Sequence, residues 1–162
     1  MDDLSNNKDV RRWPKIDRHL RLSKDGEFEV TSAFGGLVFL ECFNGGNLSI
    51  QISEVIPTPT FTLGQTENDW ATQSQHPGLW CHLSGHHISF TIPSKSIRDL
   101  SFERLTLALE FWDNIVLSHF ELRGEGTNRK EWIVADEQPR LGYMHSGYPI
   151  GNHGTVSIDF WL

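Results

Sequence analysis

The chain has 162 residues, enough for one domain with a sizeable core, and its 38% apolar content includes six Trp and ten Phe. Its formal net charge of -7 excludes a nucleic-acid surface, because such a surface needs clustered Lys and Arg. No stretch approaches the ~20 apolar residues that span a bilayer, so no membrane-spanning segment is predicted.

The first part of the chain predicts a disordered segment followed by strands. Residues 1–12 are polar and are expected to be disordered, so the domain itself is expected to span 13–162. Phe28–Ser32 alternates weakly and is a first candidate strand. Leu37–Phe43 is an apolar run that predicts a buried strand, and Leu48–Ser53 alternates as its hairpin partner across an Asn-Gly-Gly-Asn turn.

The middle of the chain predicts an extended segment, a short helix, a loop and a further strand. Val55–Leu63 is expected to be extended but not central in a sheet, because its prolines cannot donate to a ladder. Thr66 is a candidate cap for a short helix. Gln73–Gly85 is polar and is expected to be a loop, whereas Ile88–Ile92 alternates as a strand.

The longest helical pattern runs over Ser101–Arg123. Ser101 can cap the amino end, Gly124 fits a left-handed stop, and Asp113 is among the residues expected to face water. One face is formed by residues at spacings of three and four, and further apolar residues widen it: Leu105, Ala108, Leu109, Trp112, Ile115, Val116 and His119, then Leu107, Phe111, Leu117 and Phe120. A helix this apolar must pack against other elements, and the flanking strands are expected to bury its apolar face.

Strand and loop patterns follow the helix. Trp132–Ala135 predicts a strand, Gln138–Ile150 a loop, and Thr155–Leu162 a last alternating strand. Together the elements predict an α+β fold, an antiparallel β-sheet or sandwich with one long packed helix at about residues 101–123.

The cysteines and the amino-terminal residues give information about the cellular compartment of the protein. Cys42 and Cys81 are too few for a disulfide framework, and both are predicted to be buried free thiols. No apolar signal sequence follows Met1. The localisation therefore stays open between an intracellular protein and one whose signal belongs to a longer chain.

Two of the eight histidines have a spacing that occurs in metal sites. His82 and His86 are four residues apart, as in zinc metallopeptidases, which need such a pair on a helix with a Glu between them as general base. Ser84 and Gly85 lie between these two, and no His-Glu dipeptide occurs in the chain. No Gly-x-Ser-x-Gly nucleophile elbow is present either. No catalytic or metal-ligating residue is therefore predicted.

One loop is a candidate ligand-contact surface, because it combines aromatic, histidine and serine side chains with glycines. Its candidate residues are Tyr143, Met144, His145, Ser146 and Tyr148. The alternative is a tightly packed turn whose glycines serve only its backbone conformation.

Five segments of the chain, in order, resemble those of a known family. They are FGGLVFLE (34–41), FTLGQT (61–66), HISFTIPS (87–94), LEFWDNIV (109–116) and, most specific, GYMHSGYPI (142–150). With them the chain resembles peptidase family M60, the enhancin-like zinc metallopeptidases, which also includes the TRPM8 channel-associated factors of animals.

The resemblance implies cleavage of glycoproteins such as mucins for the enzyme members, and a role in ion-channel trafficking for the channel-associated members. Zinc is expected for full-length enzymes of the family, but this sequence lacks the family's His-Glu-x-x-His motif, so no cofactor is assigned to it. Only the loop 143–148 is expected to lie near the family's cleft. Two hypotheses stay open: a truncated, inactive M60-like domain, or a non-catalytic binding or adaptor module for a glycoprotein or a membrane channel protein.

Overall fold

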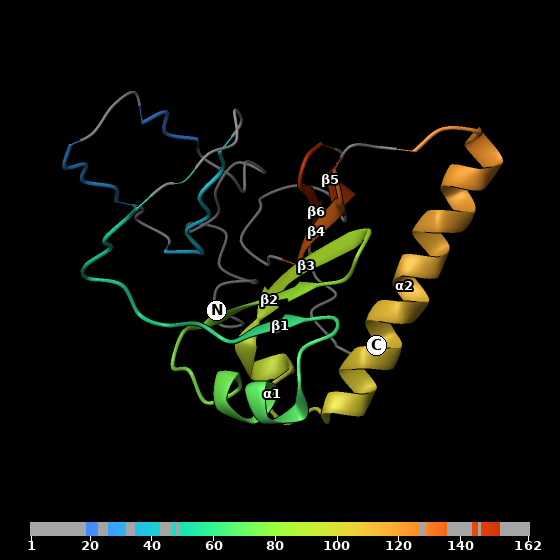
Figure 1. Ribbon diagram of the computed structural model, residues 1–162, viewed down its shortest axis with the longest axis horizontal. Coiled ribbons are helices and arrows are strands. Elements are labelled where there is room, and N and C mark those ends of the chain that lie inside the picture. Colours follow the sequence, from blue (N-terminus) through green and yellow to red (C-terminus); the bar gives the residue numbers. More distant parts are fainter. Residues whose placement is uncertain are drawn as a thin grey trace, which may run out of the picture.

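A computed structural model describes residues 19–22, 26–31, 35–42, 47, 49–126, 129–135, 144–145 and 147–152. In these residues a six-stranded sheet has the order β1-β2-β3-β4-β6-β5. The strands are β1 (Thr60–Thr62), β2 (Trp80–Ser84), β3 (Ile88–Pro93), β4 (Glu131–Ala135), β5 (Met144–His145) and β6 (Ile150–Asn152). The helices are α1 (Glu67–Gln73), the short 3-10 helix η2 (Ser94–Ser96) and α2 (Phe102–Arg123). Figure 1 shows α2 running along one side of the sheet.

The α+β class is confirmed, but the sheet is mixed rather than antiparallel. β2 and β3 are antiparallel, as are β5 and β6, whereas β1–β2, β3–β4 and β4–β6 are parallel. The helices explain the difference, because α1 carries the chain from β1 back to the start of β2, and α2 does the same between β3 and β4. The described strands form a single sheet, so the expected sandwich is not found in this part of the chain.

Both helices begin where the sequence predicts. At α1, the Asp69 backbone N–H donates to the Thr66 hydroxyl (3.2 Å) while the Thr66 N–H donates to the Asp69 carboxylate (3.0 Å), which is a capping box. At α2, the Arg104 N–H donates to the Ser101 hydroxyl at 3.2 Å. Gly124 ends α2 in the left-handed region, with φ 73°.

The core lies between α2 and the facing side chains of the sheet. From the strands it takes Phe61, Cys81, Leu83, Ile88, Phe90, Ile92 and Ala135, and from α2 it takes Leu105, Leu109 and Val116. Trp112 packs edge-on against Phe90, with ring centroids 5.7 Å apart. Alternate residues of β2 and β3 thus point to the helix, which is the period expected of a strand with one face on a core.

Asp113 joins α2 to the turn between β2 and β3. Its carboxylate is 5% exposed and accepts hydrogen bonds from the backbone N–H groups of His86 (2.7 Å), His87 (2.7 Å) and Ile88 (3.2 Å). A Cβ added to Gly85 would lie 2.7 Å from the same carboxylate. The expectation that Asp113 faces water is wrong, because the turn supplies the donors that a buried carboxylate needs.

The expected strands before β1 are not found in the described residues. Residues 28–31, 37–42 and 49–53 form no strand, and Val38, Leu40 and Ile50 are exposed. Phe39 instead reaches the sheet through its ring, which contacts His82 and Trp132. An apolar run predicts that its side chains will pack, but it does not predict whether its backbone will pair with a neighbouring strand. The backbone of residues 37–42 does not pair with one.

Two further expectations from the sequence need correction. The expected loop at 73–85 contains strand β2, whose buried Cys81 and Leu83 alternate with half-buried Trp80, His82 and Ser84. Cys81 is a buried free thiol as predicted, but Cys42 is exposed. The expected segment 1–12 and the last expected strand, 155–162, lie outside the described residues.

Candidate functional site on the His82–Trp132 face

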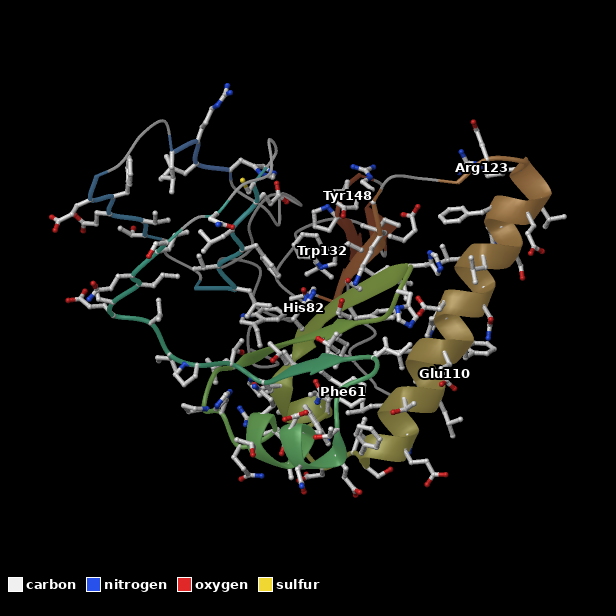
Figure 2. The ribbon with its side chains drawn as sticks, viewed as in Figure 1. Phe61, His82, Glu110, Arg123, Trp132 and Tyr148 are labelled. Atoms are coloured by element: carbon white, nitrogen blue, oxygen red, sulfur yellow. The ribbon has the colours of Figure 1, made fainter. Side chains whose placement is uncertain are left out.

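The face of the sheet turned away from α2 carries a different set of side chains. In register, Thr60 lies beside His82, His82 beside Thr91, and Ser89 beside Trp132. Because side chains alternate along a strand, these residues point away from the core. We call this surface the His82–Trp132 face; Figure 2 shows both residues, with Tyr148, on the side of the sheet away from α2.

Aromatic rings gather on this face. The ring of Phe39 lies 5.0 Å from that of His82 and 4.8 Å from that of Trp132, both in edge-on geometry. Trp132 also contacts Tyr148 edge-on, with centroids 6.0 Å apart. The Trp132 indole N–H donates to the Thr91 hydroxyl at 3.0 Å, which fixes the orientation of the indole.

Cationic groups border the aromatic rings. The Arg129 guanidinium carbon lies 3.7 Å from the centre of the Tyr148 ring, a cation–π arrangement. The Tyr148 hydroxyl donates to the Lys130 backbone carbonyl at 3.1 Å. The Lys130 ammonium donates to the Ser84 hydroxyl (2.8 Å) and to the Gly85 carbonyl (2.7 Å), so it ties β4 to the end of β2.

The surroundings shift two pKa values on this face. Burial, and then the nearby charge of Lys130, lower the pKa of His82 to about 4, so its imidazole is neutral at neutral pH. Burial raises the pKa of Tyr148; Arg129 opposes this effect, and Glu41 and Glu131 add to it. The phenol of Tyr148 therefore stays protonated and can keep its hydrogen bond.

The structure places one candidate loop side chain at this site. Tyr148 lies on the His82–Trp132 face, at the turn into β6. Met144 and His145 form β5, the edge strand paired with β6, so the expectation of a loop at 138–150 is wrong for these residues. Tyr143 and Ser146 lie outside the described residues.

The sequence analysis did not identify His82 as part of this face or Arg129 as a contact of Tyr148. His82 lies in the expected loop at 73–85, although Cys81 and Leu83 alternate with it as in a half-buried strand. Arg129 reaches Tyr148 only because β4 and β6 lie side by side in parallel, which local pattern does not reveal.

The described residues do not fit a zinc ion. In the part of the chain that the structure describes, no three His, Cys, Asp or Glu side chains are grouped so that they could hold a metal. His82 instead contacts rings and lies 3.4 Å from the Thr91 hydroxyl. Ring faces, cations and a phenol suit this face to contact with a ligand through stacking and hydrogen bonds.

Among the described residues, no helix has the length and apolar character needed to cross a membrane.

Two solved structures align with part of the chain. The ZmpB metallopeptidase from Clostridium perfringens aligns with a TM-score of 0.48 and 14% identity over 59% of this chain and 24% of that chain. The M60 catalytic domain of ZmpC from the same organism, in complex with the sialyl T antigen, aligns with a TM-score of 0.49 and 13% identity over 59% of this chain and 24% of that chain.

Sequence comparison gives a closer match. The TRPM8 channel-associated factor homolog of Xenopus laevis is 35% identical over 94% of this chain and 17% of its own length. TRPM8 channel-associated factor 2 of Homo sapiens is 31% identical over the same shares. This chain thus spans about a sixth of the length of these relatives.

The model of the family described as peptidase M60, enhancin and enhancin-like, matches residues 54–159. With more than half of its residues matched, the chain belongs to the peptidase M60 family.

Proposed function

We propose that this chain acts as a non-catalytic binding module, with a membrane channel protein as its partner. The observation that supports this most directly is the similarity to TRPM8 channel-associated factors, at 29–35% identity over 94% of the chain. The chain spans 17% of the length of those relatives, and we propose an association with TRPM8 for this segment.

The chemistry of the residues favours binding over hydrolysis. Zinc peptidases use a metal-activated water and a general base, and the family places both on a His-Glu-x-x-His motif. The 162-residue sequence contains no His-Glu dipeptide. The His82–Trp132 face offers the indole of Trp132, the phenol of Tyr148 and the guanidinium of Arg129, which are groups typical of protein-binding sites.

We place the contact surface on this face and include the adjoining loop. The candidate residues are Tyr143, Met144, His145, Ser146 and Tyr148. The neighbouring rings of Trp132 and Tyr148 also suit stacking on sugars, so a glycoprotein such as a mucin is the competing ligand.

Surface plasmon resonance with the immobilised 162-residue chain tests the proposal. Purified TRPM8 is expected to bind saturably, and a mucin-type glycopeptide is expected to bind more weakly. Tyr148→Ala and Arg129→Ala should each weaken TRPM8 binding about tenfold, the effect of losing roughly 1.4 kcal/mol. Arg123→Ala, which removes an exposed arginine at the end of α2, is the matched control and should leave binding unchanged.

Each contrary result has a distinct meaning. Saturable binding of the glycopeptide without binding of TRPM8 would replace the channel with a glycan ligand. Cleavage of either probe by the chain would refute a non-catalytic role.

A further inference from the structure

The side of α2 turned away from the core carries large apolar residues in water. Leu107, Phe111 and Leu122 are 58%, 61% and 87% exposed. With 3.6 residues per turn, the three side chains lie within about 60° of one another around the helix, and we call them the α2 outer stripe. The opposite side of α2, with Leu105 and Leu109, is fully buried in the core, so the helix is apolar on two sides.

Glutamates line one edge of the α2 outer stripe. Glu103, Glu110 and Glu121 are all exposed. They fall within about 20° of one another around the helix and about 50° from Leu107. Figure 2 labels Glu110 on α2, in the half of the helix nearer its amino end. The other edge carries Arg104, so the negative charge is concentrated on one flank of the stripe.

We propose that the α2 outer stripe docks a basic amphipathic helix of a partner protein. Apolar side chains one turn apart on that helix would seat against Leu107 and Phe111, whose spacing of four residues is the spacing of helix-to-helix anchors. Lysines or arginines along one flank would meet Glu103, Glu110 and Glu121, and complementary charge of this kind fixes the orientation of docking.

The charge pattern argues against an antiparallel second copy of this chain as the occupant. In a two-fold antiparallel pair of α2 helices, the same flank of each helix faces its counterpart. Glu103, Glu110 and Glu121 would then approach the same three residues of the other copy, and like charges facing across an interface are unfavourable. A cationic partner removes that repulsion. This surface lies on the opposite side of the sheet from the His82–Trp132 face, so it is independent of the proposed function.

A designed peptide tests this inference with the intact chain. The probe is a fluorescein-labelled helical peptide with leucines at i and i+4 along one face and lysines on one flank, measured by fluorescence anisotropy. We expect saturable binding that weakens as salt is added. Phe111→Asp should weaken it at least about tenfold. Leu122→Asp, at an 87% exposed position, is a second variant whose folding should be unaffected.

The controls distinguish binding at the α2 outer stripe from nonspecific hydrophobic binding. Leu79→Asp changes an apolar residue that is 76% exposed between α1 and β2, and it should leave peptide affinity unchanged. The triple change Glu103→Gln, Glu110→Gln and Glu121→Gln should weaken binding and flatten its salt dependence.

Three outcomes would overturn the inference. One is equal affinity for a peptide with glutamates in place of the lysines. Another is unchanged affinity in both aspartate variants. The third is a dimer in analytical ultracentrifugation that Phe111→Asp abolishes, because it would assign the stripe to a second copy. Failure of TRPM8 binding with intact peptide binding would count against the proposed function alone.

Discussion

At the residue scale, Asp113 shows how a charge is accommodated inside the core. Helical periodicity places it among polar positions, but it accepts three backbone N–H bonds from the turn at 86–88. Local pattern could not predict this, because the donors come from residues 25 to 27 positions earlier in the chain. The carboxylate thus supports the turn that joins β2 and β3.

Asp113→Asn is expected to destabilise the fold by about 2–3 kcal/mol, because the amide's NH2 group would face a backbone donor and leave it unpaired. Urea unfolding measures the effect. Glu110→Gln removes an exposed carboxylate from the same helix and should change stability by no more than about 0.5 kcal/mol. Equal losses in the two variants would show that the turn does not depend on the Asp113 carboxylate.

His82 makes stability depend on pH. Its pKa is about 4 in the folded chain, against an ordinary value of 6.5, so between these values the unfolded chain binds the proton and the folded chain does not. Stability is therefore expected to fall as pH drops from 6.5 to 4, by up to about 3 kcal/mol.

The urea midpoint as a function of pH checks this expectation. His82→Gln should remove most of the slope in that range, whereas His86→Gln, at an exposed position, should keep it. If both variants retain the slope of the parent chain, burial of His82 is not its cause.

At the scale of elements, the ends of the helices were predictable and the direction of the strands was not. Ser101, Gly124 and Thr66 act through bonds or dihedrals within a few residues, so their residue types indicate the helix ends. Strand direction depends on where a helix returns the chain. The alternation of apolar and polar residues along a strand is the same whether its neighbour is parallel or antiparallel. The predicted antiparallel pairing is therefore found only for β2–β3 and β5–β6, and the other pairs are parallel.

Ser101→Ala is expected to destabilise the fold by about 1 kcal/mol, because the Arg104 backbone N–H loses its acceptor. Ser118→Ala is the matched control. Ser118 is exposed and its hydroxyl donates to the Asn114 carbonyl within α2, so the substitution should be neutral or slightly stabilising. Urea unfolding of the two variants checks the difference, and no loss in Ser101→Ala would contradict the capping role.

At the scale of the whole molecule, the family could be predicted from the sequence and the candidate site only in part. Collinear segments such as GYMHSGYPI led to the M60 family, which the family match confirms. The loop led to Tyr148, but Arg129, which contacts Tyr148, and Phe39 and His82, which contact Trp132, come from other parts of the chain. These residues lie close together only because of the order of the strands in the sheet. Whether the loop contacts a ligand stays a prediction.

We propose above that the His82–Trp132 face contacts a channel protein without cleaving it. Hydroxyl-radical footprinting of the chain, alone and with saturating TRPM8, measures this contact residue by residue. If the proposal holds, Tyr148 is oxidised more slowly in the complex, whereas the rate at the exposed Leu79 is unchanged. An unchanged rate at Tyr148 when TRPM8 is saturating would contradict it.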